Sequence, residues 1–292
     1  MRGNPDAYEL IAPGTLPAVL DLLASAPGEW TPIAGGTELM VAFAAGRLGA
    51  RKLVNLWGIP DLRFIKTTPE NFVIGSCATF LDLRSHAALA AELPLIPKSA
   101  SWIGSVANQN RATLGGNLAN GSPAADSSPA LLVYDAEIEL ISTRGSRRVP
   151  YAEFHTGYKS NVLATDELLY AIHLPRRYAH HRQYLRKVGT RRAMAISKVA
   201  LGATALIQGN VVSEIRLAAA SLAPFPTRLY KTEAALLGQP INGETAQTAA
   251  RALLDEARPI DDIRSTAEYR KRVAANLLQE FLLELSKEGA PQ

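Results

Sequence analysis

The sequence contains a single cysteine, Cys77, among 292 residues. One thiol forms no internal disulfide, and alone it holds neither an iron–sulfur cluster nor a structural zinc ion. We therefore interpret Cys77 as a small apolar core residue. No metal site is predicted in this chain, and any metal chemistry linked to it is expected on another chain.

Long apolar runs are also missing. No stretch of 18 or more apolar residues occurs, so no segment is expected to span a membrane. Residues 1–15 have no apolar core of the signal-peptide type. The sequence therefore predicts a cytoplasmic protein, and 47% apolar and 20% charged residues are typical of a folded chain.

The two best-known phosphate-binding motifs are absent. No G-x-G-x-x-G follows a predicted strand, which argues against a Rossmann site, and no G-x-x-x-x-G-K-[ST] occurs, which argues against a P-loop. Two other glycine segments are present instead, PIAGGTEL at 32–39 and ATLGGNLAN at 112–120. Each places Gly-Gly beside hydroxyl or amide side chains.

These glycine segments have the chemistry of a phosphate site. Glycine permits positive φ and close approach of a ligand, and consecutive free N–H groups bind anions. We expect Thr37 to begin a helix through about Ala45, and Thr113 and Asn117 to add hydrogen bonds. A lone Gly-Gly is most often a turn, but two similar segments favour a dinucleotide ligand.

Asp126 follows the second glycine segment in SPAADSSP at 122–129. A carboxylate repels phosphate, so we expect Asp126 to bind a ribose hydroxyl or a ring N–H. Capping the following helix is the alternative, and the two roles are compatible.

The remaining pattern indicates two domains. We expect helices at 15–26 and 97–103. The segment at 104–123 is dense in Gly, Asn, Ser and Ala, a composition that is poor for a core and suits a backbone that bonds to something other than itself. A boundary is expected near 175–182. Beyond it, strand-like runs precede helical ones, which indicates a separate α+β domain. The strand-like runs lie at 184–188, 197–207 and 212–221, and the helical ones at 230–237, 244–257 and 266–285.

A basic run occupies residues 176–192 and includes Arg191 and Arg192. Such a run can meet phosphates or an acidic partner, and an RNA-binding protein is one alternative. Only Tyr178 and Tyr184 are interleaved there, and no RNA-binding motif is visible, so we favour a solvated linker followed by a strand.

The motifs at 34–39 and 113–126 resemble the two flavin loops of the flavoprotein subunit of molybdenum hydroxylases. That family includes the FAD domain of xanthine dehydrogenase and the medium subunit of carbon monoxide dehydrogenase. The resemblance covers nearly the whole chain through further segments at 103–105, 154–159, 166–175, 187–192, 223–228 and 262–270.

The resemblance implies an α+β fold in two parts. A vanillyl-alcohol-oxidase-type FAD-binding domain would occupy residues 1–176, with two α+β subdomains at about 1–57 and 58–176. A smaller α+β C-terminal domain, an antiparallel sheet plus helices, would occupy 177–292.

The resemblance also implies the cofactor site. Ile103 would lie near the isoalloxazine ring, where animal xanthine dehydrogenases have an aromatic residue, and Tyr170 and Lys187 match positions near the cofactor. The FAD-binding residues are then Pro32, Ile33, Ala34, Gly35, Gly36, Thr37, Glu38, Leu39, Ile103, Thr113, Gly115, Gly116, Asn117, Asp126, Tyr170 and Lys187.

The implied activity is that of an FAD-dependent oxidoreductase subunit in a hetero-oligomer, for which a dimer of heterotrimers is one arrangement. Partner chains would be a [2Fe–2S] small subunit and a large subunit with the molybdenum cofactor. Electrons would pass from the clusters through FAD to NAD⁺ or another acceptor. The flavin supplies the chemistry, so no catalytic side chain is predicted. A self-contained FAD-dependent oxidoreductase of similar fold is the alternative.

Overall fold

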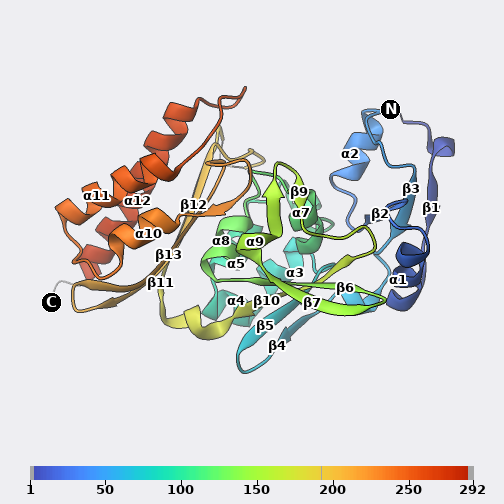
Figure 1. Ribbon diagram of the computed structural model, residues 1–292, viewed down its shortest axis with the longest axis horizontal. Helices are drawn as coiled ribbons and strands as arrows, with labels where there is room; N and C mark the ends of the chain where they lie inside the picture. The colour runs from blue at the N-terminus through green and yellow to red at the C-terminus, as the bar shows by residue number, and fades with distance from the viewer. Residues whose placement is uncertain (1–2, 192, 289–292) are drawn as a thin grey trace.

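A computed structural model describes residues 3–191 and 193–288, so Arg192 of the basic run lies outside the described residues. The chain begins with a three-stranded parallel sheet of order β1–β3–β2, flanked by α1 and α2 (Figure 1). The strands are β1 (Glu9–Ile11), β2 (Trp30–Ile33) and β3 (Lys52–Asn55), and the helices are α1 (Leu16–Ser25) and α2 (Leu39–Ala44).

The middle of the chain forms a five-stranded antiparallel sheet of order β4–β5–β10–β6–β7, covered by short helices (Figure 1). Its strands are β4 (Ile65–Thr67), β5 (Asn71–Gly75), β6 (Glu137–Ser142), β7 (Gly145–Pro150) and β10 (Leu168–Pro175). The helices are α3 (Phe80–Ser85), α4 (Ala87–Glu92), α5 (Leu95–Ala100), α6 (Val106–Gln109), α7 (Leu114–Asn120), α8 (Ser128–Val133) and α9 (Tyr151–Phe154). A small hairpin joins β8 (His155–Gly157) to β9 (Ser160–Asn161).

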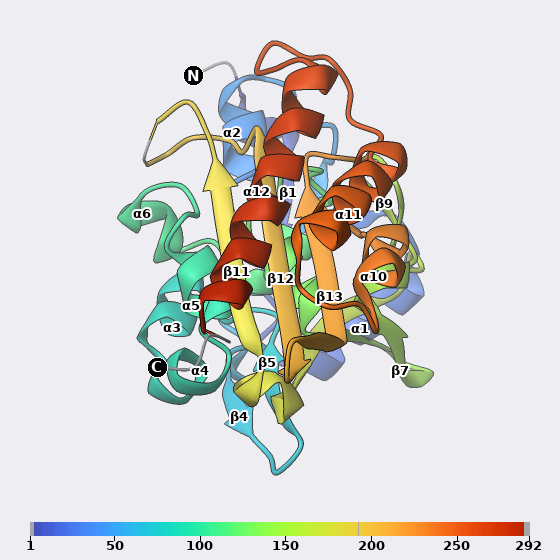
Figure 2. The same cartoon turned by 90° about the vertical axis from the view of Figure 1, so that its left-hand side faces the viewer.

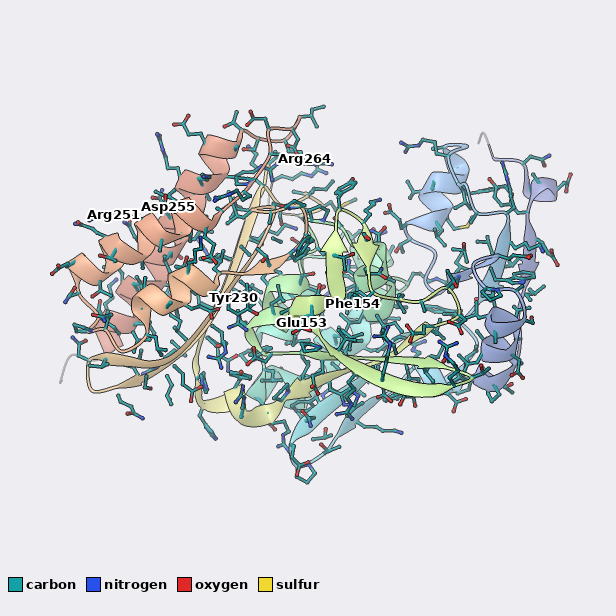
Figure 3. All side chains as sticks on the ribbon, in the orientation of Figure 1. Glu153, Phe154, Tyr230, Arg251, Asp255 and Arg264 are labelled. Carbon is teal, nitrogen blue, oxygen red and sulfur yellow. The ribbon has the colours of Figure 1, made fainter. Side chains whose placement is uncertain are left out.

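The C-terminal part is an antiparallel sheet of order β11–β12–β13–β14 with three helices on one face. Figure 2 shows α12 lying across the strands, and in Figure 3 Arg251 and Asp255 of α11 lie on the outer side of this layer. The elements are β11 (Arg182–Val188), β12 (Val199–Gln208), β13 (Val211–Ala220), β14 (Thr227–Arg228), α10 (Tyr230–Leu236), α11 (Gly243–Glu256) and α12 (Ala267–Glu288).

The predicted helix at 15–26 is confirmed, with Thr15 accepting the Ala18 N–H as its N-cap. The strands and helices of the C-terminal domain are also confirmed. The expected helix at 97–103 is displaced, because α5 runs from Leu95 to Ala100. The backbone at 104–123 was expected to bond to something other than itself, but α6 and α7 both lie in this segment, so much of its backbone bonds within the helices.

The middle part of the chain and the C-terminal sheet are linked around Asp135, at the end of α8. Arg216 and Arg228 of the C-terminal sheet contact its carboxylate at 3.2 and 2.6 Å, and Tyr178 donates a hydrogen bond to it. Burial by itself would raise the pKa of Asp135, but the Tyr178 hydroxyl and the two guanidinium groups hold it below its ordinary value. The contact is therefore between charged groups, and the residues that form it are far apart in the sequence.

The basic run is tied into the fold by acidic partners. Arg176 pairs with Glu92 at 2.7 Å, and Arg186 pairs with Glu280 at 3.2 Å. Arg177 contacts Asp135 at 2.9 Å. These contacts disfavour the RNA-binding alternative, because these three cations are matched by carboxylates within the chain. No helix among residues 3–191 and 193–288 is long and apolar enough to cross a membrane.

Candidate functional site

The first glycine segment is an open loop between β2 and α2. Gly36 has φ +74°, a conformation that glycine adopts without strain. The helix starts at Leu39, with Glu38 in the cap position, so the prediction that Thr37 begins it was wrong by two residues. Among the described residues, no carbonyl accepts a hydrogen bond from the amides of Gly35, Gly36, Thr37 or Glu38.

Gly35 fixes where this loop lies. A Cβ on Gly35 would come within 1.8 Å of the Arg111 carbonyl oxygen, so only glycine fits against that backbone. The Arg111 guanidinium in turn stacks on the ring of Trp57, with 3.8 Å from Cζ to the ring centroid. Arg111 directly precedes the second glycine segment, so the close approach of Gly35 to the Arg111 carbonyl brings the two glycine segments together.

The second glycine segment is a helix, not a loop. Thr113 is the N-cap of α7, and its hydroxyl accepts the Gly116 N–H at 3.1 Å. The amides of Leu114 and Gly115 donate to Ala78 O and Ser76 O, and Asn117 N donates to Thr113 O. The expectation that these amides bind an anion was therefore wrong, because the protein's own oxygens accept all of them.

The glycines of α7 serve close packing instead. A Cβ on Gly115 would lie 2.5 Å from Ser76 Cβ and 2.8 Å from Ser76 O. The side chain of Asn117 is only partly engaged. Its Oδ1 accepts a hydrogen bond from Ser127 at 2.6 Å, and its amide nitrogen has no partner among the described residues.

Two neighbouring cavities lie where the segments meet. A polar one of about 260 Å³ is lined by the open loop, by Ile103 and by the start of α7. A largely apolar one of about 290 Å³ lies next to it, with Trp30, Leu56 and Leu168 in its wall. Ala34 and Gly116 line both cavities, so the two cavities are direct neighbours.

Most of the predicted residues line one of these cavities. The polar cavity has Ala34, Gly35, Gly36, Thr37, Glu38, Leu39, Ile103, Thr113, Gly116 and Asn117 in its wall. The apolar cavity has Pro32, Ala34, Gly115 and Gly116. Neither includes Ile33, Asp126, Tyr170 or Lys187.

Asp126 and Lys187 contact each other. Lys187 Nζ lies 2.5 Å from Asp126 Oδ2, and Ser197 donates a hydrogen bond to the other carboxylate oxygen. Burial raises the pKa of Asp126, although Lys187 and Ser197 both act in the opposite direction. Asp126 is buried, both of its carboxylate oxygens are bonded inside the protein and it lines neither cavity, so this arrangement does not favour the expected contact with a ribose hydroxyl. Lys187 also reaches the carbonyl of Trp102, at 3.4 Å, next to Ile103.

Tyr170 and Ile33 contact residues that line the cavities. The Tyr170 carbonyl accepts the Ser76 N–H at 2.9 Å, and its ring packs against Phe64 with 5.9 Å between centroids. Ile33 is half-buried, and its Cδ1 would lie 3.7 Å from a Cβ on Gly36. Both residues therefore position backbone that borders the cavities.

Sequence reasoning missed several residues of the site. Asn108 and Asn120 line the polar cavity, and Ser76 lines the apolar one. Lys159 lies 3.5 Å from Glu38 in an ion pair that joins the β8–β9 turn to the open loop. The two asparagines could have been found from the asparagine-rich composition of 104–123, whereas nothing in the sequence distinguishes Ser76.

Two family profiles cover the chain. The one described as the FAD binding domain in molybdopterin dehydrogenase matches residues 6–177, and the one described as the CO dehydrogenase flavoprotein C-terminal domain matches 184–285. A xanthine dehydrogenase FAD-binding subunit of Escherichia coli O157:H7 is 32% identical over 272 residues, which is 92% of this chain and 93% of that protein. The carbon monoxide dehydrogenase medium chain of Hydrogenophaga pseudoflava is 27% identical over 95% of this chain and 96% of its own.

Solved structures show the same likeness. A carbon monoxide dehydrogenase from Hydrogenophaga pseudoflava that lacks the Mo-pyranopterin moiety superposes with a TM-score of 0.91, at 27% identity, over 97% of this chain and 98% of its own. Reconstituted CO dehydrogenase from Oligotropha carboxidovorans gives 0.92, at 25% identity, over 99% of this chain and 100% of its own. The similarity therefore extends over both parts of the fold.

Proposed function

Because the chain belongs to the family of FAD-binding subunits of xanthine and carbon monoxide dehydrogenase-type molybdenum hydroxylases, we propose that it carries electrons from [2Fe–2S] clusters through FAD to NAD⁺ or another acceptor. The clusters and the molybdenum cofactor would lie on separate small and large subunits of a cytoplasmic hetero-oligomer. The observation that supports this most directly is the pair of adjoining cavities that share Ala34 and Gly116.

The described residues fit FAD. We assign the pyrophosphate to the amides of Gly35, Gly36, Thr37 and Glu38, because free N–H groups in an open loop make a concave anion site. Thr113 and Asn117 line the same cavity, and their side chains would supply further polar contacts. When bound, FAD supplies the redox chemistry that the side chains of this chain lack.

The residues that line the two cavities indicate which end of the cofactor occupies each one. The polar cavity contains Ile103, whose apolar side chain suits one face of the isoalloxazine ring. The adenine end then enters the apolar cavity beside Trp30 and Leu168. Gly116, which lines both cavities and has no side chain, would lie beside the chain of phosphates and sugars.

We place Asp126 and Lys187 beside the ring end. Their ion pair lies against Trp102 O, one residue before Ile103. In this position the Lys187 ammonium favours negative charge on a reduced ring, and Asp126 orients that ammonium. Ile33 and Tyr170 act through the backbone that they hold.

The test uses the assembled complex. Purified complex should contain one FAD for each copy of this chain, seen as flavin absorbance. Removing the flavin should abolish reduction of the terminal acceptor by substrate, while substrate still bleaches the iron–sulfur absorbance. Adding FAD back should restore reduction of the acceptor. Acceptor reduction that survives flavin removal would contradict the proposed electron path.

A further inference from the structure

Ser76 lines the apolar cavity and has a buried hydroxyl. The residue is 5% exposed, and apart from a weak contact with the neighbouring Cys77 thiol its Oγ has no hydrogen-bond partner among the described residues. Its backbone groups are both engaged, since N–H donates to Tyr170 O and C=O accepts from Gly115 N, each at 2.9 Å. The hydroxyl is thus the one polar group of Ser76 left for a ligand.

An unpaired buried hydroxyl weakens the folded state, because it loses its bonds to water and gains none in return. Alanine would occupy this position with the same backbone contacts and without that loss. Such groups in a folded protein call for an explanation, and a missing ligand in the adjoining cavity supplies one.

The one carboxylate that the described residues bring to the wall of this cavity is already bonded, because Glu167 accepts hydrogen bonds from Arg147 and from the Ala164 amide. The rest of the wall includes Leu23, Trp30, Leu56 and Leu168, which suit a flat aromatic ring. A ring with a polar edge can therefore bury its faces on these side chains and present that edge to Ser76.

We propose that the Ser76 hydroxyl hydrogen-bonds the nitrogen-bearing edge of the adenine base, which makes Ser76 a specificity-determining residue for adenine nucleotides. The inference rests on the proposed function, since it takes FAD as the ligand that extends through both cavities. It goes further in assigning base recognition to a side chain outside both glycine segments.

The first test compares ligands that contain adenine with one that does not. In the full-length chain, Ser76→Ala should weaken binding of FAD and of ADP alike, by about fivefold to tenfold, and leave FMN binding unchanged. The substitution should also leave the melting temperature of the ligand-free chain unchanged or raise it. A residue with a purely structural role would lose stability instead.

Ser128→Ala is the matched control. Ser128 is also fully buried, but its hydroxyl accepts a hydrogen bond from Tyr151 at 2.6 Å, and it lines neither cavity. This variant should lower the melting temperature and leave the affinity ratio of ADP to FMN unchanged. The two variants therefore separate the loss of a protein hydrogen bond from the loss of a ligand contact.

Cys77 gives an independent readout of where the base lies. It lines the same cavity, is 1% exposed and is the only cysteine in the sequence. Burial raises its pKa to about 11, so it should react slowly with a small apolar thiol reagent. ADP should slow this labelling further, FMN should not, and Ser76→Ala should shift the ADP protection curve to higher concentration.

Some outcomes would overturn the inference. Equal ADP affinity in wild type and Ser76→Ala would do so, as would a Ser76→Ala defect in FMN binding or protection of Cys77 by FMN. The proposed function fails separately, if the folded wild-type chain and its complex take up no FAD. ADP binding that still depends on Ser76 would then keep the base contact and reject only the flavin.

Discussion

Residues 35–38 connect β2 to α2, and their amides have no acceptor among the described residues, whereas the amides of residues 114–117 at the start of α7 are all bonded to the protein. The two segments share a Gly-Gly pair and nearby hydroxyl or amide side chains. In the first, glycine leaves donors open for an anion. In the second, glycine lets a helix pack against the backbone of Ser76. Similar sequence thus leaves donors free in one place and serves core packing in the other.

The strongest test of this difference is Gly115→Ala. The new Cβ would lie 2.5 Å from Ser76 Cβ in a buried position where neither backbone can easily move. We expect the free energy of unfolding to fall by about 3 kcal/mol, as in overpacked cores. Chemical denaturation of the flavin-free chain measures it. A loss confined to FAD affinity, with stability intact, would show that α7 is not built into the core as described.

Gly35→Ala should have the opposite profile. Its Cβ would clash with the Arg111 carbonyl, but the loop is partly exposed and can shift away. Because its amides then lose alignment with the pyrophosphate, we expect FAD affinity to fall by about tenfold, the worth of one charge-assisted hydrogen bond. Fluorescence titration with FAD measures this. Stability should change less than in Gly115→Ala, and the reverse order would refute the comparison.

The two threonines give a milder test. Thr113→Ala removes the N-cap of α7 and should cost about 1 kcal/mol of stability. Thr37→Ala removes a side chain that caps no helix, so thermal unfolding should be unchanged while FAD affinity falls slightly. Equal stability losses in the two variants would mean that both segments act as helix starts.

The smallest effect is expected at Glu38. Its side chain is exposed and lies near the amides assigned to the pyrophosphate, so Glu38→Gln removes like-charge repulsion. We expect FAD affinity to rise by about twofold at low salt and the gain to disappear at high salt, because exposed charges are screened. Titrations at two ionic strengths measure it. A loss of affinity at low salt would indicate that Glu38 accepts a hydrogen bond from the ligand.

Much of this structure could be predicted from residues that are close together in the sequence. The Thr15 cap, the spacing of apolar residues in α1 and the order of strands and helices after residue 184 all rest on near neighbours. The composition of residues 112–120 also identified a segment that lines the polar cavity. Its helical state was missed, because Gly115 and Gly116 disfavour a helix unless packing overrides propensity.

What was not predicted depends on distant contacts. The Asp126–Lys187 pair joins residues 61 positions apart, and Ser197 completes it from the start of the next strand region. Neither residue alone indicates that both will turn toward each other. The unpaired state of the Ser76 hydroxyl likewise depends on which groups surround it, and no spacing rule reports that.

Helix α8 has a further consequence for how this chain can be divided. All six of its residues, Ser128 to Val133, are buried, and the helix packs against β12 and β13 on one side and α5 and α9 on the other. A Cβ on Gly202 of β12 would come within 3.0 Å of the Pro129 carbonyl. Severing the polypeptide between β10 and β11 would therefore strip both fragments of a shared hydrophobic wall, and each should be insoluble unless the two are produced together.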